Sequence, residues 1–202
     1  MKKSRAETAE TRRRILEVAA REFRRNGILG TGLAEIMSAA GLSHGGFYRH
    51  FASKDQLVAE AFAADMDTFV GSAKAAVEQG EDAILKHMEN YLSSERRDDC
   101  LGQCPISALG SELSRADGET RGAASRSVRK LIDALTVPGH SKNLASARAD
   151  AIAALSSLIG AATLSRIVDD RKLSDAILSE TKRRLAARRS KSRHKPDTSN
   201  GK

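Results

Sequence analysis

Apolar residues recur every three or four positions along most of the chain, and this spacing predicts a series of amphipathic helices. In the first segment Ile15, Val18 and Phe23 follow the spacing, and Asn26-Gly27 is typical of a helix end. We find no internal repeat and no segment that alternates apolar and polar residues in the manner of a half-buried strand. The pattern therefore predicts an all-α fold of about nine helices.

Two short helices follow the first one, over residues 33–40 and 43–50, and Gly41 lies in the turn between them. Phe47 and Phe51 are four residues apart, so they lie on one helix face and are expected in the core. Two short helices that are joined by a tight turn containing glycine and braced by a longer helix are typical of a helix-turn-helix.

Gly45 and Gly46 stand side by side in the first turn of the third predicted helix, directly after the capping residue Ser43. Each glycine costs about 1 kcal/mol of helix propensity relative to alanine. A helix with only a structural role would not place both there. We infer that another molecule approaches this backbone closely.

The rest of the chain predicts a longer second domain. Ser53 and Gln56 form a capping box that opens a long helix ending at Gly80, and Cys104-Pro105 opens another after a charged loop over residues 95–102. Further helices are expected at about 81–94, from residue 118 to Pro138, over 144–168, and around 173–185. We predict a helix-turn-helix domain over 1–52, a helical effector-binding and dimerisation domain over 53–187, and a basic disordered tail over 188–202.

Composition agrees with this all-helical pattern. The chain has 202 residues, of which 40% are hydrophobic and 30% charged, and it has only three prolines. No uninterrupted apolar run approaches the roughly 18 residues that would cross a bilayer, and the N-terminus lacks the apolar core of a signal peptide. With two cysteines, too few for a disulfide scaffold, we expect a reduced, cytoplasmic protein without a membrane partner.

The net charge of +8 is unevenly distributed. Residues 1–60 carry +4, residues 61–181 carry −4, and residues 182–202 carry +8. Basic ends are typical of a protein with a polyanionic partner such as nucleic acid. The alternative is that these lysines and arginines only solvate helices, and charge alone does not decide between the two.

Residues 12–62 resemble the DNA-binding domain of TetR/AcrR-type transcriptional regulators. The resemblance is carried by an ordered set of short motifs: Ile15-Leu16, Phe23, Ile36-Met37, Ala40-Gly41-Leu42-Ser43, Gly45, Phe47-Tyr48-Arg49-His50-Phe51, Ser53-Lys54 and Leu57. The remaining segment has the length of the family's ligand-binding and dimerisation domain, with little motif content.

The resemblance implies that the third helix enters the major groove of double-stranded DNA. It also implies which residues contact DNA, namely Thr31, Ser43, His44, Gly45, Gly46, Tyr48, His50 and Lys54. The family usually has threonine as the cap of the second helix, where it also binds a phosphate, whereas this chain has Gly32 there. His44 is the main candidate for a base contact, because the two glycines have no side chains to read bases.

Three further groups have both a functional and a structural interpretation. Candidates for lining an effector cavity are Met66, Phe69, Met88, Tyr91, Cys104, Ile106, Leu109 and Leu131, and each of them could equally be plain core. A dimer interface built from the last two helices, as the resemblance implies, would use Ala151, Leu155, Leu158, Ile159, Ala162, Ile177, Leu178 and Leu185; the alternative is burial within one protomer. Cys100 and Cys104 could form a thiol sensor or be small buried hydrophobes.

The expected function is that of a homodimeric repressor, which a small-molecule effector releases from a near-palindromic operator. One alternative is a nonspecific DNA-compacting protein that uses the basic ends. Another is an all-α enzyme, although the sequence shows no nucleophile–base pair, phosphate loop or metal-ligand set. We expect neither a metal nor another cofactor.

Overall fold

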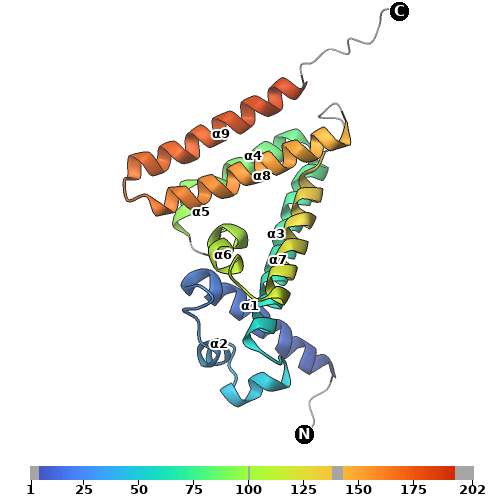
Figure 1. Ribbon diagram of the computed structural model, residues 1–202, viewed down its shortest axis with the longest axis vertical. Coiled ribbons are helices and arrows are strands. Elements are labelled where there is room, and N and C mark those ends of the chain that lie inside the picture. The colour runs from blue at the N-terminus through green and yellow to red at the C-terminus, as the bar shows by residue number, and fades with distance from the viewer. Residues whose placement is uncertain (1–4, 100, 138–142, 194–202) are drawn as a thin grey trace, which may run out of the picture. The chain divides into compact units, whose positions relative to one another are not determined.

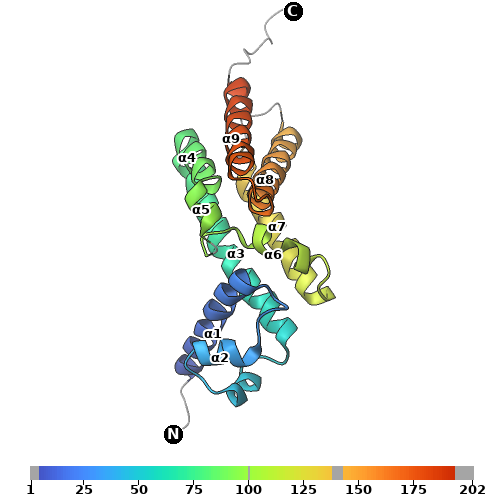
Figure 2. The same cartoon turned by 90° about the vertical axis from the view of Figure 1, so that its left-hand side faces the viewer.

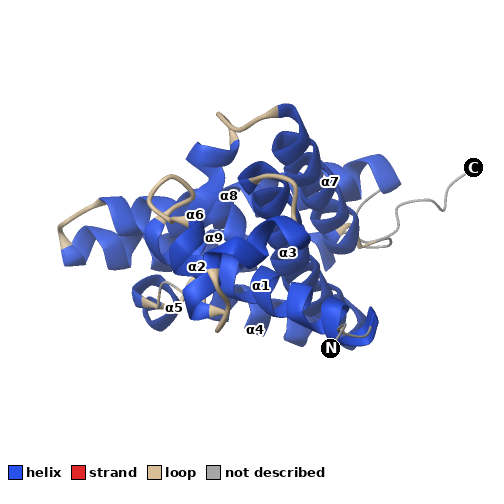
Figure 3. Ribbon diagram, turned by 90° about the horizontal axis from the view of Figure 1, so that it is seen from below, coloured by secondary structure: helices blue, strands red, loops and turns tan. Residues whose placement is uncertain are grey.

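The computed structural model describes residues 5–99, 101–137 and 143–193, and within these ranges the chain is helical without any strand (Figures 1 and 3). The all-α prediction is therefore confirmed. The elements are α1 (Arg5–Asn26), α2 (Leu33–Ala39), the 3₁₀ helix η1 (His44–Arg49), α3 (Lys54–Gln79), α4 (Glu81–Tyr91), α5 (Ser94–Asp98), α6 (Pro105–Leu113), α7 (Gly118–Leu135), α8 (Leu144–Ile167) and α9 (Arg171–Arg193).

Contacts divide the chain into two compact units. The first comprises Met1–Ser72 and Asp99–Lys130, and the second comprises Ala73–Asp98 and Leu131–Lys202. The sequence placed its first boundary at residue 52. The structure instead groups the first part of α3 and all of α6 with the N-terminal helices, because α6 packs against α1.

The N-terminal helices enclose a small aromatic and aliphatic core. Ile15, Phe23 and Ile36 are buried, as are Phe47 and Phe51, whose rings stack with centroids 5.7 Å apart. These are residues that the helical spacing assigned to the core, so that prediction is confirmed. This core fixes η1 against α1 and α2.

Three local features differ from the sequence prediction. The third helix is 3₁₀ and not α, because six residues that include two glycines form too short and too weak a segment for an α-helix. Part of the predicted charged loop folds as α5. The last helix continues to Arg193, so residues 188–193 are helical; residues 194–202 of the predicted disordered tail lie outside the described residues, as does Cys100.

In the second unit α8 and α9 lie side by side (Figures 1 and 2), and α8 is apolar on two faces. One face is buried within the protomer and includes Ala151, Leu155 and Leu158. By length and composition α8 would be able to cross a membrane, and 33% of that apolar window is buried. The sequence estimate missed this because it considered only uninterrupted apolar runs.

A buried arginine joins α5 to α9 within the same unit. The Arg97 side chain is 4% exposed and donates to Asp175 at 2.6 Å, to Ser174 at 2.8 Å and to Asp98 at 2.8 Å. Hydrogen bonds from Arg97 and then Arg171 lower the pKa of Asp98 to about 2. The buried guanidinium of Arg97 is therefore paired with two carboxylates and a hydroxyl, as a buried charge requires.

Candidate DNA-binding surface and effector cavity

The turn between α2 and η1 is a Schellman motif. Gly41 has φ +69°, the left-handed conformation that glycine adopts without strain. Its N–H donates to the Ser38 carbonyl at 2.9 Å, and the Leu42 N–H donates to the Met37 carbonyl at 2.9 Å. These bonds satisfy the last carbonyls of α2 and turn the chain directly into η1, as the sequence predicted.

One side of η1 faces the core and the other faces solvent. Phe47 is fully buried, whereas His44 and Arg49 are exposed and Tyr48 is 68% exposed. Ser43 occupies the N-cap position, but its hydroxyl makes no capping bond to the helix. Tyr48 therefore faces away from the core.

The two glycines of η1 have different surroundings. A Cβ atom added at Gly45 would have no neighbour within 4 Å, whereas one added at Gly46 would lie 3.6 Å from the Met37 methyl carbon. The bare backbone that faces outward is therefore that of Gly45. Gly46 lies on the inner side, where α2 passes.

Thr31 and Lys54, both predicted as phosphate contacts, make contacts within the protein. Thr31 is 1% exposed, and its hydroxyl donates to the Gly27 carbonyl at 2.6 Å, so it is not available to a phosphate. The Lys54 ammonium donates to the carbonyls of Ile28 and Thr31, each at 2.7 Å. Because an ammonium has three N–H groups, Lys54 keeps one for another acceptor.

An arginine of α1 anchors the C-terminal end of η1. Arg12 pairs with Glu60 of α3 at 2.6 Å, its Nε donates to the His50 carbonyl at 3.3 Å, and its guanidinium lies 4.5 Å from the centroid of the Phe51 ring. The hydrogen bond from Arg12 lowers the pKa of Glu60, which keeps that carboxylate charged. His50 is half-buried beside this anchor.

Sequence reasoning missed Arg49 as a site residue. It is exposed on η1 next to Tyr48, and it makes no ion pair with another described residue. By contrast, Arg13 of α1 is held between Glu10 at 2.7 Å and Glu17 at 2.6 Å. Its position in the sequence, directly after Tyr48 in the short third helix, could have made Arg49 a candidate.

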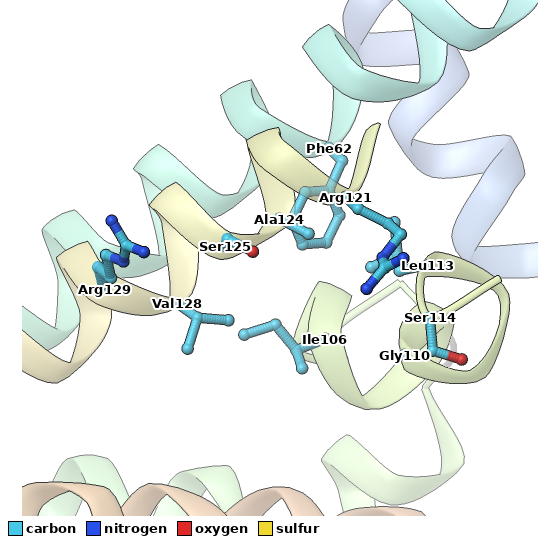
Figure 4. A pocket seen from close by; sticks show the side chains of 10 residues that line it. All are labelled: Phe62, Ile106, Gly110, Leu113, Ser114, Arg121, Ala124, Ser125, Val128 and Arg129. Carbon is cyan, nitrogen blue, oxygen red and sulfur yellow. The ribbon is translucent and has the colours of Figure 1, made fainter. Parts of the chain in front are cut away.

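The predicted effector residues do not form one cavity. All except Phe69 and Ile106 are buried, and Cys104 is 2% exposed at the N-cap of α6. A cavity of about 430 Å³ lies instead between α3, α6 and α7 (Figure 4), and Ile106 is the one predicted residue that lines it. Its lining consists of Phe62, Ile106, Gly110, Leu113, Ser114, Arg121, Ala124, Ser125, Val128 and Arg129.

A second, smaller cavity of about 300 Å³ lies between α4 and α9 and includes Met88, another of the predicted residues. Glu89, Lys182 and Arg183 also line it. Its charged groups have both signs, so it has no clear preference for a charged ligand.

Most of the predicted dimer-interface residues are buried within the protomer. Ala151, Leu155, Leu158, Leu178 and Leu185 are each less than a tenth exposed, because α8 and α9 pack on each other. Ile159, Ala162 and Ile177 are partly exposed. The exposed large apolar side chains on these helices are others, which sequence periodicity did not separate from the buried set: Leu144, Ile152, Leu164, Ile167 and Leu173.

Comparison with known proteins finds similarity over the N-terminal part of the chain. Residues 15–61 match the model for bacterial regulatory proteins of the tetR family. The HTH-type transcriptional regulator AcrR of Shigella flexneri is 44% identical over 59 residues, which cover 29% of this chain and 27% of that protein. The HTH-type transcriptional repressor KstR2 of Rhodococcus jostii (strain RHA1) is 33% identical over 72 residues, which cover 36% and 35%.

These sequence matches span about a third or less of the curated relatives, whereas the structural match is longer. The reduced form of Escherichia coli NemR has the same fold, with a TM-score of 0.75 over 88% of this chain and 96% of that one, at 20% identity. At this identity the likeness shows the fold alone. Residues 15–61, which include the Schellman turn into η1, are therefore similar to bacterial regulatory proteins of the tetR family, and the chain shares its fold with NemR.

Proposed function

We propose that this protein is a ligand-responsive transcriptional repressor that binds a near-palindromic operator as a homodimer. The observation that carries the proposal is the outer side of η1, where the bare backbone of Gly45 lies among the exposed side chains of His44, Tyr48 and Arg49. The match of residues 15–61 to the tetR family supports the same function, and the relative KstR2 is named as a repressor. The family is one of regulators and not of enzymes, so we infer no catalytic role.

The exposed side chains of η1 suit two different kinds of DNA contact, because their chemistry differs. Tyr48 and Arg49 offer a hydroxyl and a guanidinium, which commonly bind phosphate oxygens and set the register on the duplex. His44, at the start of η1, is positioned to reach base edges once the absence of a side chain at Gly45 lets the backbone come close. Base contacts in the major groove carry the sequence information.

Homodimer formation would cover the exposed apolar stripe of α8. Ile152, Leu164 and Ile167 lie within about 120° of one another around the helix axis, given 100° per residue. They are 44%, 52% and 71% exposed, and they lie opposite the face that is buried against α9. Apposition of two copies would bury this stripe. A near-palindromic operator requires the two η1 segments of such a dimer to enter successive major grooves about 34–36 Å apart.

The apolar stripe of α8 gives a direct test of the dimer. Leu164→Glu should convert the protein to a monomer in sedimentation velocity, because a carboxylate would be buried at the interface. Leu29→Glu is the matched control, because Leu29 is 85% exposed in the first unit and outside the stripe. A Leu164→Glu variant that stays dimeric would contradict this interface.

The DNA-compacting alternative relies on the basic C-terminal end, but part of that charge is already paired. Arg183 pairs with Glu180, and Arg188 pairs with Asp150, each at 2.6 Å. Arg189 pairs with Glu81 at 2.6 Å. These pairs reduce the positive charge that α9 offers to a polyanion and favour the operator-binding proposal.

Electrophoretic mobility shifts with DNA from upstream of the protein's own gene and its neighbours would test DNA binding across a salt series. We expect one short site to stay bound at salt concentrations that release random DNA. Arg49→Gln should weaken binding to all sequences and reduce the slope of log K against log salt by about 2, because the homodimer loses one phosphate contact from each protomer. His44→Ala should instead relax base preference.

Arg184→Gln is the matched control, because it removes an exposed arginine of α9 that makes no ion pair with another described residue. It should leave binding of the short site unchanged. If Arg184→Gln weakens binding while Arg49→Gln does not, and no short site survives at high salt, the compacting function is the correct one. Expression of a reporter gene placed behind the mapped site then distinguishes the two kinds of regulator. A repressor lowers this expression, and an activator raises it.

A further inference from the structure

The cavity between α3, α6 and α7 combines an apolar body with positive charge. Phe62, Ile106 and Val128 supply hydrocarbon surface, and Arg121 and Arg129 supply two guanidinium groups (Figure 4). Among its lining residues there is no carboxylate. A ligand in this cavity would therefore meet apolar surface and positive charge, with no negative charge to oppose an anion.

The arginines of the cavity are not neutralised by the rest of the unit. Lys130, at the end of the same segment of α7, pairs with Asp67 at 2.7 Å. Arg121 and Arg129 make no ion pair with any residue that the structure describes. Arg12 and Arg24 of the same unit, by contrast, pair with Glu60 and Asp65.

The two arginines point in different directions. In Figure 4 the Arg121 side chain reaches from α7 toward Leu113 and Ser114 of α6, whereas the Arg129 guanidinium points away from Val128 and Ile106. The charged end of the cavity is therefore the one near Arg121. The apolar end lies where Ile106 and Val128 face each other.

We propose that the effector is an amphipathic organic anion, a carboxylate with an aryl or alkyl body, whose charge pairs with Arg121 and whose body lies on Ile106 and Val128. This proposal rests on the ligand response proposed above and adds the chemical class of the ligand. A guanidinium binds a carboxylate through two parallel hydrogen bonds, which makes Arg121 a suitable recognition group. The volume of about 430 Å³ lies in the range of small-molecule sites.

The same helix that lines the cavity also contacts the DNA-binding segment. Ile106, Leu113 and Ser114 of α6 line the cavity, and Glu112 of α6 accepts a hydrogen bond from the Leu29 N–H at 2.9 Å. Leu29 belongs to the α1–α2 loop, whose carbonyls at residues 28 and 31 hold Lys54. An anion that favours one position of α6 would therefore bias this loop, provided that its affinity differs between the two positions.

Isothermal titration calorimetry of the full chain would test the ligand class with three probes of one shape. The probes are naphthalene-1-acetate, its neutral amide, and the cation 1-naphthylmethylammonium. We expect the carboxylate to bind at least about tenfold more tightly than the amide, a difference of about 1.4 kcal/mol. The cation should bind least, because it would face the guanidinium of Arg121.

Two variants assign the selectivity to the cavity. Arg121→Gln should weaken carboxylate binding about tenfold and leave amide binding unchanged. Arg126→Gln is the control, since Arg126 is an exposed arginine of α7 that does not line the cavity. Because Arg121 is exposed, the variant should keep its unfolding temperature, and this is measured alongside.

Equal or tighter binding of the amide or the cation would overturn the proposal. So would unchanged carboxylate binding in Arg121→Gln, or no carboxylate binding at millimolar concentration. Operator binding by the ligand-free protein is measured separately. Failure to bind any operator would refute the proposed function, whereas intact operator binding without carboxylate recognition would refute only the ligand class.

Discussion

Replacing the two η1 glycines with alanine should separate their roles in DNA binding and in folding. Neither glycine adopts a left-handed backbone conformation, and neither added Cβ atom would come closer than 3.6 Å to a neighbour. Alanine therefore fits both positions without strain. It also reduces the conformational entropy of the unfolded chain, which stabilises a protein by about 0.4–1 kcal/mol for each such change.

The Gly45→Ala/Gly46→Ala variant should accordingly be more stable by about 1–2 kcal/mol. In a chain of this length, that raises the unfolding temperature by about 2–8 °C. Operator affinity of the folded variant should nevertheless fall about tenfold, because the methyl group at position 45 would project from the outer side of η1 toward the DNA. Calorimetric unfolding and a binding titration against the mapped operator measure the two effects.

The two single variants should separate the effect on operator affinity from the effect on stability, because the two positions face different ways. Gly45→Ala alone should account for most of the lost affinity, and Gly46→Ala, which faces Met37, should change stability more than binding. Gly41→Ala is the control for the stability assay. It has open space around it but φ +69°, so it should destabilise the protein by about 1 kcal/mol.

If the double variant unfolds more easily and its affinity per folded molecule is normal, the glycines serve the fold and the DNA argument is refuted. An unchanged affinity in Gly45→Ala would equally show that the bare backbone at this position has no role in binding. A normal Gly41→Ala would indicate that the stability assay does not resolve backbone strain.

Three further predictions concern the contacts around the site and the buried arginine. Lys54→Met should lower the free energy of unfolding in urea by about 2–4 kcal/mol, because it removes two charge-assisted hydrogen bonds to loop carbonyls. An unchanged urea midpoint would show that these two hydrogen bonds do not stabilise the protein. Glu112→Ala should leave operator binding of the ligand-free protein intact but weaken its release by the carboxylate probe, because the contact with the Leu29 N–H is lost. The folded-state pKa of Asp98 is lowered from 3.8 to about 2, so its contribution to stability is present above about pH 4 and is lost as the pH falls to about 2. The difference in stability between wild type and Asp98→Asn should shrink over that window, and a constant difference would contradict the pairing with Arg97.

Local sequence patterns were sufficient for several helix ends and for the turn between α2 and η1. Asn26-Gly27, Gly41 and Gly80 all mark helix ends, and each of these glycines adopts a positive φ. The Ser53 hydroxyl accepts from the Gln56 N–H at 3.0 Å, as the predicted cap requires. Such signals act over four or five residues, so a single sequence contains them completely.

The pairing of side chains across the fold was not predictable from these patterns. Thr31 and Lys54 are 23 residues apart, and only folding brings the ammonium of one to the carbonyl of the other. For a related reason the sequence did not separate the buried residues of α8 from the exposed ones. A helix such as α8 that is apolar on two faces gives no periodic signal to show that Leu155 faces α9 and Ile152 faces outward.

The effector cavity is also a result of tertiary structure. Ile106 and Arg121 come from different helices, and their sequence neighbours do not show that they share a cavity. By itself the sequence determined most of the helices, the glycine turn and the resemblance of residues 12–62 to tetR-type DNA-binding domains, because these depend on short-range propensity and on motifs of adjacent residues. Only the tertiary structure decided which glycine faces outward, which cations are already paired and where a ligand can fit, because burial and charge neutralisation depend on residues that are distant in the chain.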